Sequence, residues 1–407
     1  MRFLKSATRG AVAGCFVMAG SGAAFAGGWD TMGVGTLDLL FAPERFVVEG
    51  GATYLDRNTD YDVTSASDQL GRQTTSGSTS ERVTPNIWNY QFGVKGRVLE
   101  NVDCLGRAYN PYGIIESMDP TWAARYAGYE TNATTLGLDA TCSYTFQAGE
   151  GRSIRAIAGI RGLDLTYQSD SMLPGVLVNP ALTDDYVSGA ELKSKGMSWG
   201  WRAGVAYEIP AYALRASLVY DSQIAMDLEG ETYIRDVPDG LGGTTTITGD
   251  AYSSITAPQS VELNIQSGIA PGWLASFGVK WVDWSGIDRL VVKDESGDLS
   301  TDRALNFKDG WTVEAGVGHQ LNEKLTLGGS VQWDRGVGGS YSDSYSFGLG
   351  GSYALNDKVN MIIGGAAVYT AAGEADATNH APYGATNEYT YDSAWHYALS
   401  TKLRIAF

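Results

Sequence analysis

The chain has 407 residues, with 46 acidic and 29 basic side chains, a net charge of −17, three histidines and three cysteines. This acidic balance argues against nucleic acid as a partner, because phosphate backbones are bound by clusters of Lys and Arg. So few His and Cys residues argue against a metal centre, and we expect neither a metal nor another cofactor. No Pro-rich or low-complexity linker divides the sequence, which favours one large domain.

The N-terminus has the pattern of an export signal. Basic residues near the start precede an apolar stretch over residues 11–23, and Ala24-Phe25-Ala26 has the small residues of a cleavage site. We therefore predict a signal peptide over residues 1–26 and a mature chain that begins near Gly27. Beyond this segment the sequence has no apolar run of about eighteen residues, so we expect no membrane-spanning helix.

A period-two alternation recurs along almost the whole chain. In residues 395–407 aromatic and aliphatic side chains share one face, while Ser400 and Lys402 share the other. Residues 88–98 and 325–334 divide in the same way. A soluble sandwich would carry polar residues on its outward face, whereas apolar faces with Trp and Tyr belts opposite charged faces indicate lipid outside and a wet lumen inside. The pattern predicts an all-β transmembrane antiparallel barrel.

The connections give the number of strands, because barrels of this class have short turns at one end and long loops at the other. Six short turns are predicted near residues 99–103, 148–151, 209–212, 269–272, 321–324 and 355–358. Seven long polar stretches alternate with them, over residues 62–84, 114–132, 168–197, 222–258, 285–308, 335–344 and 371–392. These connections join about 14 strands in a barrel over residues 45–407. We expect the outer-membrane insertion machinery to recognise the terminal Phe407 and the alternating apolar residues before it.

Three groups of segments, in order along the chain, carry a resemblance to a known family. They are Asn110-Pro111-Tyr112-Gly113 followed by Trp122, Arg125 and Tyr126; Gly196 to Tyr207 with Tyr220-Asp221-Ser222 and Leu228-Glu229-Gly230; and Pro258-Gln259-Ser260-Val261-Glu262-Leu263, Trp281-Val282-Asp283-Trp284-Ser285 and Asn306-Phe307-Lys308-Asp309-Gly310-Trp311. The sequence resembles the long-chain fatty acid outer-membrane transporter family, also called the FadL/TodX family, over nearly the whole barrel.

The resemblance implies a channel in the bacterial outer membrane for passive uptake of long-chain fatty acids or similar hydrophobic molecules. It implies capture at extracellular loops and lateral release through the wall near the third strand. Expected partners are the ligand, outer-membrane lipid, lipopolysaccharide and the insertion machinery, and we expect a monomer. Two alternatives stay open, namely an aromatic hydrocarbon uptake channel and a general diffusion or structural porin.

The resemblance further implies an N-terminal plug and an opening in the wall. Residues 27–44 form a short plug segment, with an apolar cluster over residues 37–41. Pro111 cannot donate a ladder hydrogen bond, so within a strand it creates a bulge or opening, and Gly113 eases the bend. Alternatively, Pro111 ends its strand at the outer rim.

A fatty acid needs a cation for its carboxylate. Arg161, Arg202 and Lys280 are predicted to face the lumen, and our hypothesis is that at least one of them binds the carboxylate. The alternative is that each is held in an ion pair within the lumen. Candidate acidic partners are Asp139, Glu262 and Glu314.

The fatty acid tail needs an apolar lining. Leu163, Leu165 and Tyr167 lie on the inner face beside the predicted cations and are candidates for it. Trp122 and Tyr126, in the second long loop, are candidates for capturing hydrocarbon from outside. The alternative for this pair is a role as anchors at the membrane interface.

Cys104 and Cys142 fall on neighbouring antiparallel strands at comparable heights. A disulfide is one possibility in an oxidising compartment, and two inert thiols are the other, because the geometry of the bond is strict.

No catalytic constellation is recognisable. His319, His380 and His396 are scattered along the chain, and no serine nucleophile motif accompanies them. We therefore predict that the protein is not an enzyme.

Overall fold

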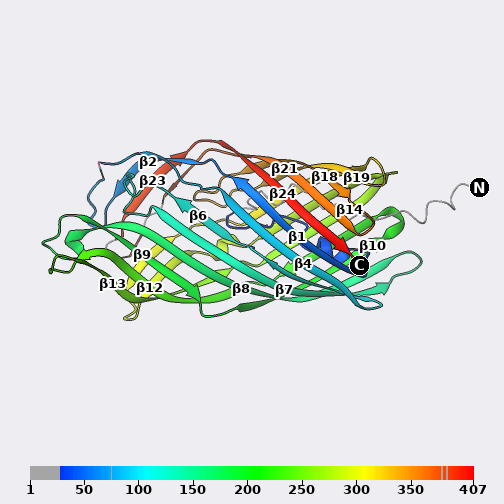
Figure 1. Ribbon diagram of the computed structural model, residues 1–407, viewed down its shortest axis with the longest axis horizontal. Helices are drawn as coiled ribbons and strands as arrows, with labels where there is room; N and C mark the ends of the chain where they lie inside the picture. The colour runs from blue at the N-terminus through cyan, green and yellow to red at the C-terminus, as the bar shows by residue number, and fades with distance from the viewer. Residues whose placement is uncertain (1–27, 75, 377–378, 382–383) are drawn as a thin grey trace, which may run out of the picture.

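The computed structural model describes residues 28–74, 76–376, 379–381 and 384–407, so the predicted signal peptide lies outside the described residues. Fourteen antiparallel strands close into a barrel (Figure 1). Around the wall they are β1 (Phe46–Asp56), β4 (Ile87–Leu99), β5 (Val102–Tyr109), β7 (Glu130–Gln147), β8 (Ser153–Pro174), β10 (Ser198–Ile209), β11 (Leu214–Asp221), β14 (Ser260–Ala270), β15 (Trp273–Val282), β18 (Gly310–Gln320), β19 (Leu325–Asp334), β20 (Ser344–Ala354), β21 (Val359–Thr370) and β24 (Ala394–Ala406). Each pairs with the next, and β24 pairs with β1. The predicted barrel of about 14 strands is confirmed.

The two ends of the barrel differ in their connections. The six predicted turns form one end, where the chain also finishes, and this end faces the periplasm in barrels of this class (Figure 1). The opposite, extracellular end is prolonged by the hairpin strands β6 (Gly113–Ser117), β9 (Asp185–Ser194), β12 (Ile224–Pro238), β13 (Thr244–Ala257), β16 (Arg289–Asp294) and β17 (Leu299–Ala304). A separate sheet contains β2 (Asp60–Ser67), β3 (Ser80–Arg82), β22 (Gly373–Asp376) and β23 (Thr386–Tyr391).

Helical structure is limited to short 3-10 turns in the described part of the chain. They are η2 (Asp38–Phe41), η3 (Gly175–Leu177), η4 (Pro210–Tyr212) and η5 (Trp284–Gly286). Within the described residues, no helix combines the length and the apolar character that crossing a bilayer requires.

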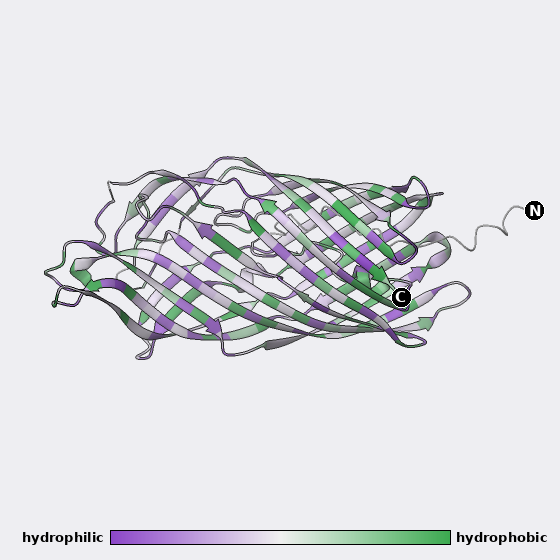
Figure 2. Ribbon diagram, viewed as in Figure 1, coloured by the Kyte–Doolittle hydropathy of each residue, from purple (hydrophilic) through white to green (hydrophobic). Residues whose placement is uncertain are grey.

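The strands alternate between two faces, as the sequence predicts. On β4, Trp88, Tyr90 and Phe92 are 50–60% exposed, whereas Lys95 is completely buried. Figure 2 shows hydrophobic and hydrophilic residues alternating along the wall strands. Because successive strand side chains point to opposite faces, the exposed aromatic rings contact lipid and the charged residues enter the lumen.

The wall has a break between β5 and β6. Pro111 interrupts the strand, and its ring packs against Gly137 on β7, where a Cβ atom would lie 3.0 Å from the proline Cδ. β6 resumes the pairing with β7, but β4 pairs with β5 only as far as Gln91. Among the described strands, β6 has no pairing with β4. The proline therefore lies within a broken strand and not at the outer rim.

The described N-terminal segment, residues 28–44, lies in the lumen and contacts this break. Thr31 N donates to Pro111 O at 3.1 Å, and Gly113 N donates to Trp29 O at 3.0 Å. Lower in the barrel, Leu37 and the apolar residues 39–42 are buried in a core cluster with wall residues. The segment thus bonds to backbone groups that the interrupted ladder leaves without strand partners.

Cys104 and Cys142 face each other in the register of β5 and β7 and are joined by a disulfide. The bond links residues 38 apart in sequence. In the chain-entropy view, a loop of this length stabilises the folded chain by roughly 4 kcal/mol. The disulfide fixes β5 to β7 on the periplasmic side of the break.

The disulfide predicts a change in gel mobility. Mature protein that is unfolded and alkylated without reductant should migrate faster than the reduced protein, because the closed loop makes the unfolded chain more compact. Cys142→Ser should remove the difference. Identical mobility of the wild-type protein in both states would show that the thiols are free.

Candidate hydrophobic ligand site

An apolar cavity lies in the extracellular half of the barrel. It encloses about 1190 Å³ of space between atoms, partly open to solvent. One wall comes from Leu165 and Tyr167 on β8, and another from Met226 and Leu228 on β12. On each strand these residues are two positions apart, so their side chains point to the same, lumen-facing side and reach the cavity. A cavity with this lining suits a hydrocarbon chain or ring.

Aromatic rings from distant parts of the chain pack at one side of the cavity. Trp29 meets Trp284 edge to face at a centroid distance of 5.8 Å and Phe307 at 5.5 Å. Tyr112 also meets Trp284, at 5.8 Å. Edge-to-face packing is a favourable geometry for such rings. The cluster includes Trp29 from the N-terminal segment, so that segment forms part of the site.

A few polar groups border the cavity. Arg303 on β17 lines it and donates to Ala127 O at 3.0 Å. Tyr389 on β23 shares a 2.7 Å hydrogen bond with the Ser340 hydroxyl. Burial and the nearby Glu116 carboxylate raise the pKa of Tyr389, so its phenol stays protonated. The cavity is therefore amphipathic, with a large apolar surface and a small polar border.

The structure places the predicted apolar residues around this cavity. Leu165 and Tyr167 line it directly, and Leu163 is buried in the adjoining cluster with Met226 and Leu228. Sequence reasoning missed Trp284 and Phe307 as lining residues. Both belong to the segments that carry the family resemblance, and this membership is the sequence feature that could have identified them as site residues.

Of the two loop aromatics, Trp122 does not have the exposed position that both of its expected roles require. Trp122 is only 1% exposed, in a cluster that includes Tyr61 and Tyr129, and its indole Nε1 donates to Gly128 O at 3.0 Å. An exposed role at the outer face, for capture or as an interface anchor, does not fit this burial. Tyr126 is half-buried, and its hydroxyl donates to Asp185 at 2.6 Å. Trp122 packs the loops together.

The predicted lumen cations form a buried network beneath the cavity. Arg202 contacts Asp221 at 2.6 Å and Asp139 at 3.2 Å. Arg161 contacts Asp221 at 3.3 Å. Both arginines are almost completely buried. A ligand carboxylate would compete here with carboxylates already bonded to the guanidinium groups.

Lys280 has a partner that the sequence did not suggest. Its ammonium bonds to Asp30 in the N-terminal segment and donates to Gly33 O at 3.1 Å. Glu262, opposite Lys280 in the register of β14 and β15, accepts a 2.9 Å hydrogen bond from Gly35 N. These two wall residues hold the N-terminal segment from one side of the lumen.

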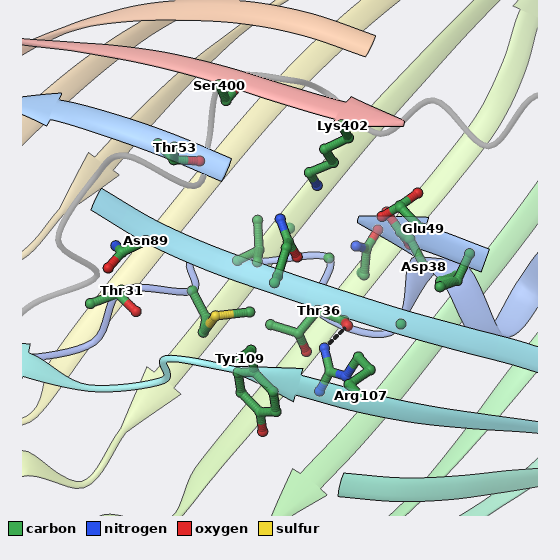
Figure 3. Close-up of a pocket in the computed structure, with 18 of the residues that line it drawn as sticks. Thr31, Thr36, Asp38, Glu49, Thr53, Asn89, Arg107, Tyr109, Ser400 and Lys402 are labelled. Carbon is green, nitrogen blue, oxygen red and sulfur yellow. Dashed lines mark hydrogen bonds between the residues drawn. The ribbon is translucent and has the colours of Figure 1, made fainter. Parts of the chain in front are cut away.

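A second cavity lies beside the break. It is lined by the N-terminal segment, by β1, β4 and β24, and on the other side of the lumen by residues of β14, β15 and β18. Figure 3 shows Thr53, Asn89, Ser400 and Lys402 around it. It encloses about 1320 Å³, again partly open to solvent, and it extends to Tyr109 at the end of β5. Its border is more polar than that of the outer cavity. The two cavities lie on either side of the segment that contacts the break.

A closed barrel with a lipid-facing exterior, an occupied lumen and an apolar cavity at its outer end defines a transport protein of the bacterial outer membrane. The family model described as outer membrane protein transport protein (OMPP1/FadL/TodX) matches residues 18–405. The chain belongs to this family. Membership in a family of transport proteins confirms the prediction that it is a channel and not an enzyme.

Individual relatives agree with this assignment. The long-chain fatty acid transport protein of Salmonella typhi is 23% identical, over 84% of this chain and 81% of its own length. Outer membrane protein P1 of Haemophilus influenzae is 24% identical, over 80% and 76%. A Pseudomonas aeruginosa FadL homologue has a similar fold, with a TM-score of 0.77, 15% identity and coverage of 96% and 98%. The Pseudomonas putida toluene transporter TodX gives a TM-score of 0.60 at 15% identity, with coverage of 91% and 92%.

Filling the outer cavity should weaken ligand binding. Ala133 on β7 lines the cavity opposite Tyr167, and Ala133→Trp places an indole in that space. We expect the affinity for a fluorescent long-chain fatty acid to fall at least about tenfold in equilibrium titrations. Ala140→Trp, on the lipid-facing side of the same strand, is the matched control and should bind normally. Equal affinities would exclude this cavity as the ligand site.

Proposed function

We propose that the barrel takes up long-chain fatty acids or similar hydrophobic molecules by passive diffusion down their concentration gradient. The observation that carries this proposal is the apolar cavity at the outer end, which lies against a segment bonded to a break in the wall. An apolar solute gains free energy on entering such a cavity, at roughly 25 cal/mol for each Å² of apolar surface removed from water. Capture therefore needs no energy input.

The N-terminal segment acts as the plug in this proposal. It separates the outer cavity from the second cavity and is held by Lys280 and Glu262 from the wall. Trp29 belongs both to the segment and to the aromatic cluster of the outer cavity. A ligand that displaces the Trp29 ring would therefore disturb the backbone bonds at Pro111 and Gly113.

Lateral release is the proposed route out of the lumen. The second cavity is lined both by lumen-facing Asn89 and Gln91 and by the lipid-facing residues Tyr90 and Phe92 of the same strand. These residues belong to the extracellular half of β4, where the strand has no pairing with β6 in the described structure. A hydrophobic solute that leaves sideways enters lipid and avoids the aqueous periplasm.

Of the two roles open to Arg161, Arg202 and Lys280, we propose the structural one. Each bonds to an acidic partner, and removal of one member of a buried ion pair leaves the other charge uncompensated. These residues would maintain the position of the N-terminal segment and the shape of the lumen. The polar border of the outer cavity, which includes Arg303, Tyr389 and Glu116, is then the first contact for the polar head group of a ligand.

Competition binding tests the function and the substrate class. A fluorescent long-chain fatty acid should bind saturably to the refolded barrel and be displaced by unlabelled oleate. Preferential displacement by toluene would instead favour an aromatic hydrocarbon channel, as the name of the TodX relative suggests for that protein. The absence of saturable binding, together with large steady ion currents in planar bilayers, would favour a general diffusion porin.

Restoring the broken strand tests the route. The double substitution Asn110→Thr with Pro111→Val supplies a ladder donor and β-branched side chains, so β5 should continue into β6. We expect normal fatty acid binding but uptake into proteoliposomes reduced at least about tenfold. Pro210→Val, in the periplasmic turn η4, serves as the control proline substitution. Unchanged uptake by the double variant would exclude release at the break.

A further inference from the structure

The inward-facing residues that stand opposite one another in the register of β24, β1 and β4 form rows across these three strands. One row differs from its neighbours in charge. In one row Arg404 stands opposite Glu49, and their side chains form an ion pair at 2.7 Å. In the row nearest the periplasm Lys95 stands opposite Val47 and pairs with Asp103 of β5 at 2.7 Å. Basic residues in this part of the lumen thus have acidic partners close by.

The next row towards the outside is Lys402, Gly51 and Gln91. Gly51 occupies the position that corresponds to Glu49, so this row has no carboxylate. A Cβ atom at residue 51 would lie 2.8 Å from Cγ of Lys402 and 3.1 Å from Thr401 O. The glycine therefore makes room for the lysine stem to cross β1, and a larger residue there would collide with it.

Lys402 extends into the second cavity (Figure 3). Among the described residues, no carboxylate oxygen lies within 4 Å of the Lys402 Nζ atom. The ion pairs of this part of the lumen are formed by other basic residues, such as Lys95, Arg215, Lys280 and Arg404. The Glu49 carboxylate in the neighbouring row attracts Lys402 electrostatically and also forms an ion pair with Arg404, so one carboxylate is shared by two cations. Lys402 is half-buried, so its charge is reachable from the cavity.

Both acidic and neutral polar groups line the cavity around the ammonium. The acidic ones are Asp38, which is paired with Arg215, Glu49, which is paired with Arg404, and Glu314. The row above consists of Ser400, Thr53 and Asn89, which all line the same cavity. Hydroxyl and amide groups can donate hydrogen bonds to an anion without neutralising the lysine. Apolar contacts come from Leu39 and Phe277, which also line the cavity.

We propose that Lys402, with the hydroxyl and amide groups beside it, is an anion subsite that receives the carboxylate of the substrate within the second cavity. This inference rests on the proposed function and deepens it, because it assigns a place where carboxylates are distinguished from neutral hydrocarbons. A fatty acid is ionised at neutral pH, whereas an alcohol of the same chain length or toluene is not. The subsite lies next to the break, so it holds the charged end while the tail faces the opening.

The test uses the cavity-filled variant Ala133→Trp as parent, so that binding at the outer cavity does not mask the second site. The barrel is held in an amphipathic polymer, since detergent micelles would take up the ligand. Saturable binding of oleate and of neutral oleyl alcohol is measured for the parent and for Lys402→Gln and Lys402→Arg. Lys324→Gln, at an exposed periplasmic turn, is the matched control.

We expect the parent to bind oleate more tightly than oleyl alcohol. Lys402→Gln should weaken oleate binding roughly tenfold without affecting the alcohol, whereas Lys402→Arg and Lys324→Gln should bind as the parent does. Oleate binding that is unchanged in Lys402→Gln would overturn the subsite, as would an equal loss for the alcohol. Saturable oleate binding by the wild-type barrel is measured in parallel. Its absence would reject the proposed function as well, while its presence confines the failure to the subsite.

Discussion

A strand inside a bilayer has no water to bond its backbone, so each N–H and C=O group must find a partner within the protein. The closed ladder from β1 to β24 meets this requirement. The break at Pro111 violates it locally, and the structure compensates from inside. Thr135 on β7 bonds to the backbone of Tyr112, while the N-terminal segment bonds to Pro111 and Gly113. The interruption of one strand thus supplies backbone partners for the segment in the lumen.

Ion pairs in the lumen also hold the N-terminal segment and the wall strands in place. Burying a charge is costly unless another charge and hydrogen bonds compensate it. Arg202 bridges Asp139 and Asp221 between wall strands, whereas Lys280 and Arg215 bond to Asp30 and Asp38 of the N-terminal segment. The first connection links the neighbouring strands β10 and β11 to β7, and the other two anchor the N-terminal segment. The lumen is therefore crossed by ion pairs that involve both the wall and the N-terminal segment.

Local patterns were sufficient to predict the barrel, because alternation and turns are short-range properties of the chain. The interior was harder to predict, since Lys280 meets a partner 250 residues away and Trp122 is buried by loops of unrelated sequence. Alternation correctly predicted that Leu165 and Tyr167 point inward, yet it could not show that Trp29, Trp284 and Phe307 meet there. Such contacts depend on how loops fold over the barrel, which has no simple period.

The two cavities impose different requirements on one substrate. The outer cavity removes a long apolar surface from water, which any hydrocarbon satisfies, so it selects weakly for the head group. Selection for a carboxylate needs a cation that is not already neutralised and that lies where water still reduces its desolvation cost. Lys402 fits these conditions, because Gly51 leaves its row without a carboxylate and Glu49 in the next row is shared with Arg404. The ammonium also borders a polar cavity. Placing this selection beside the break, and not in the outer cavity, lets one site bind for affinity while the other discriminates by charge.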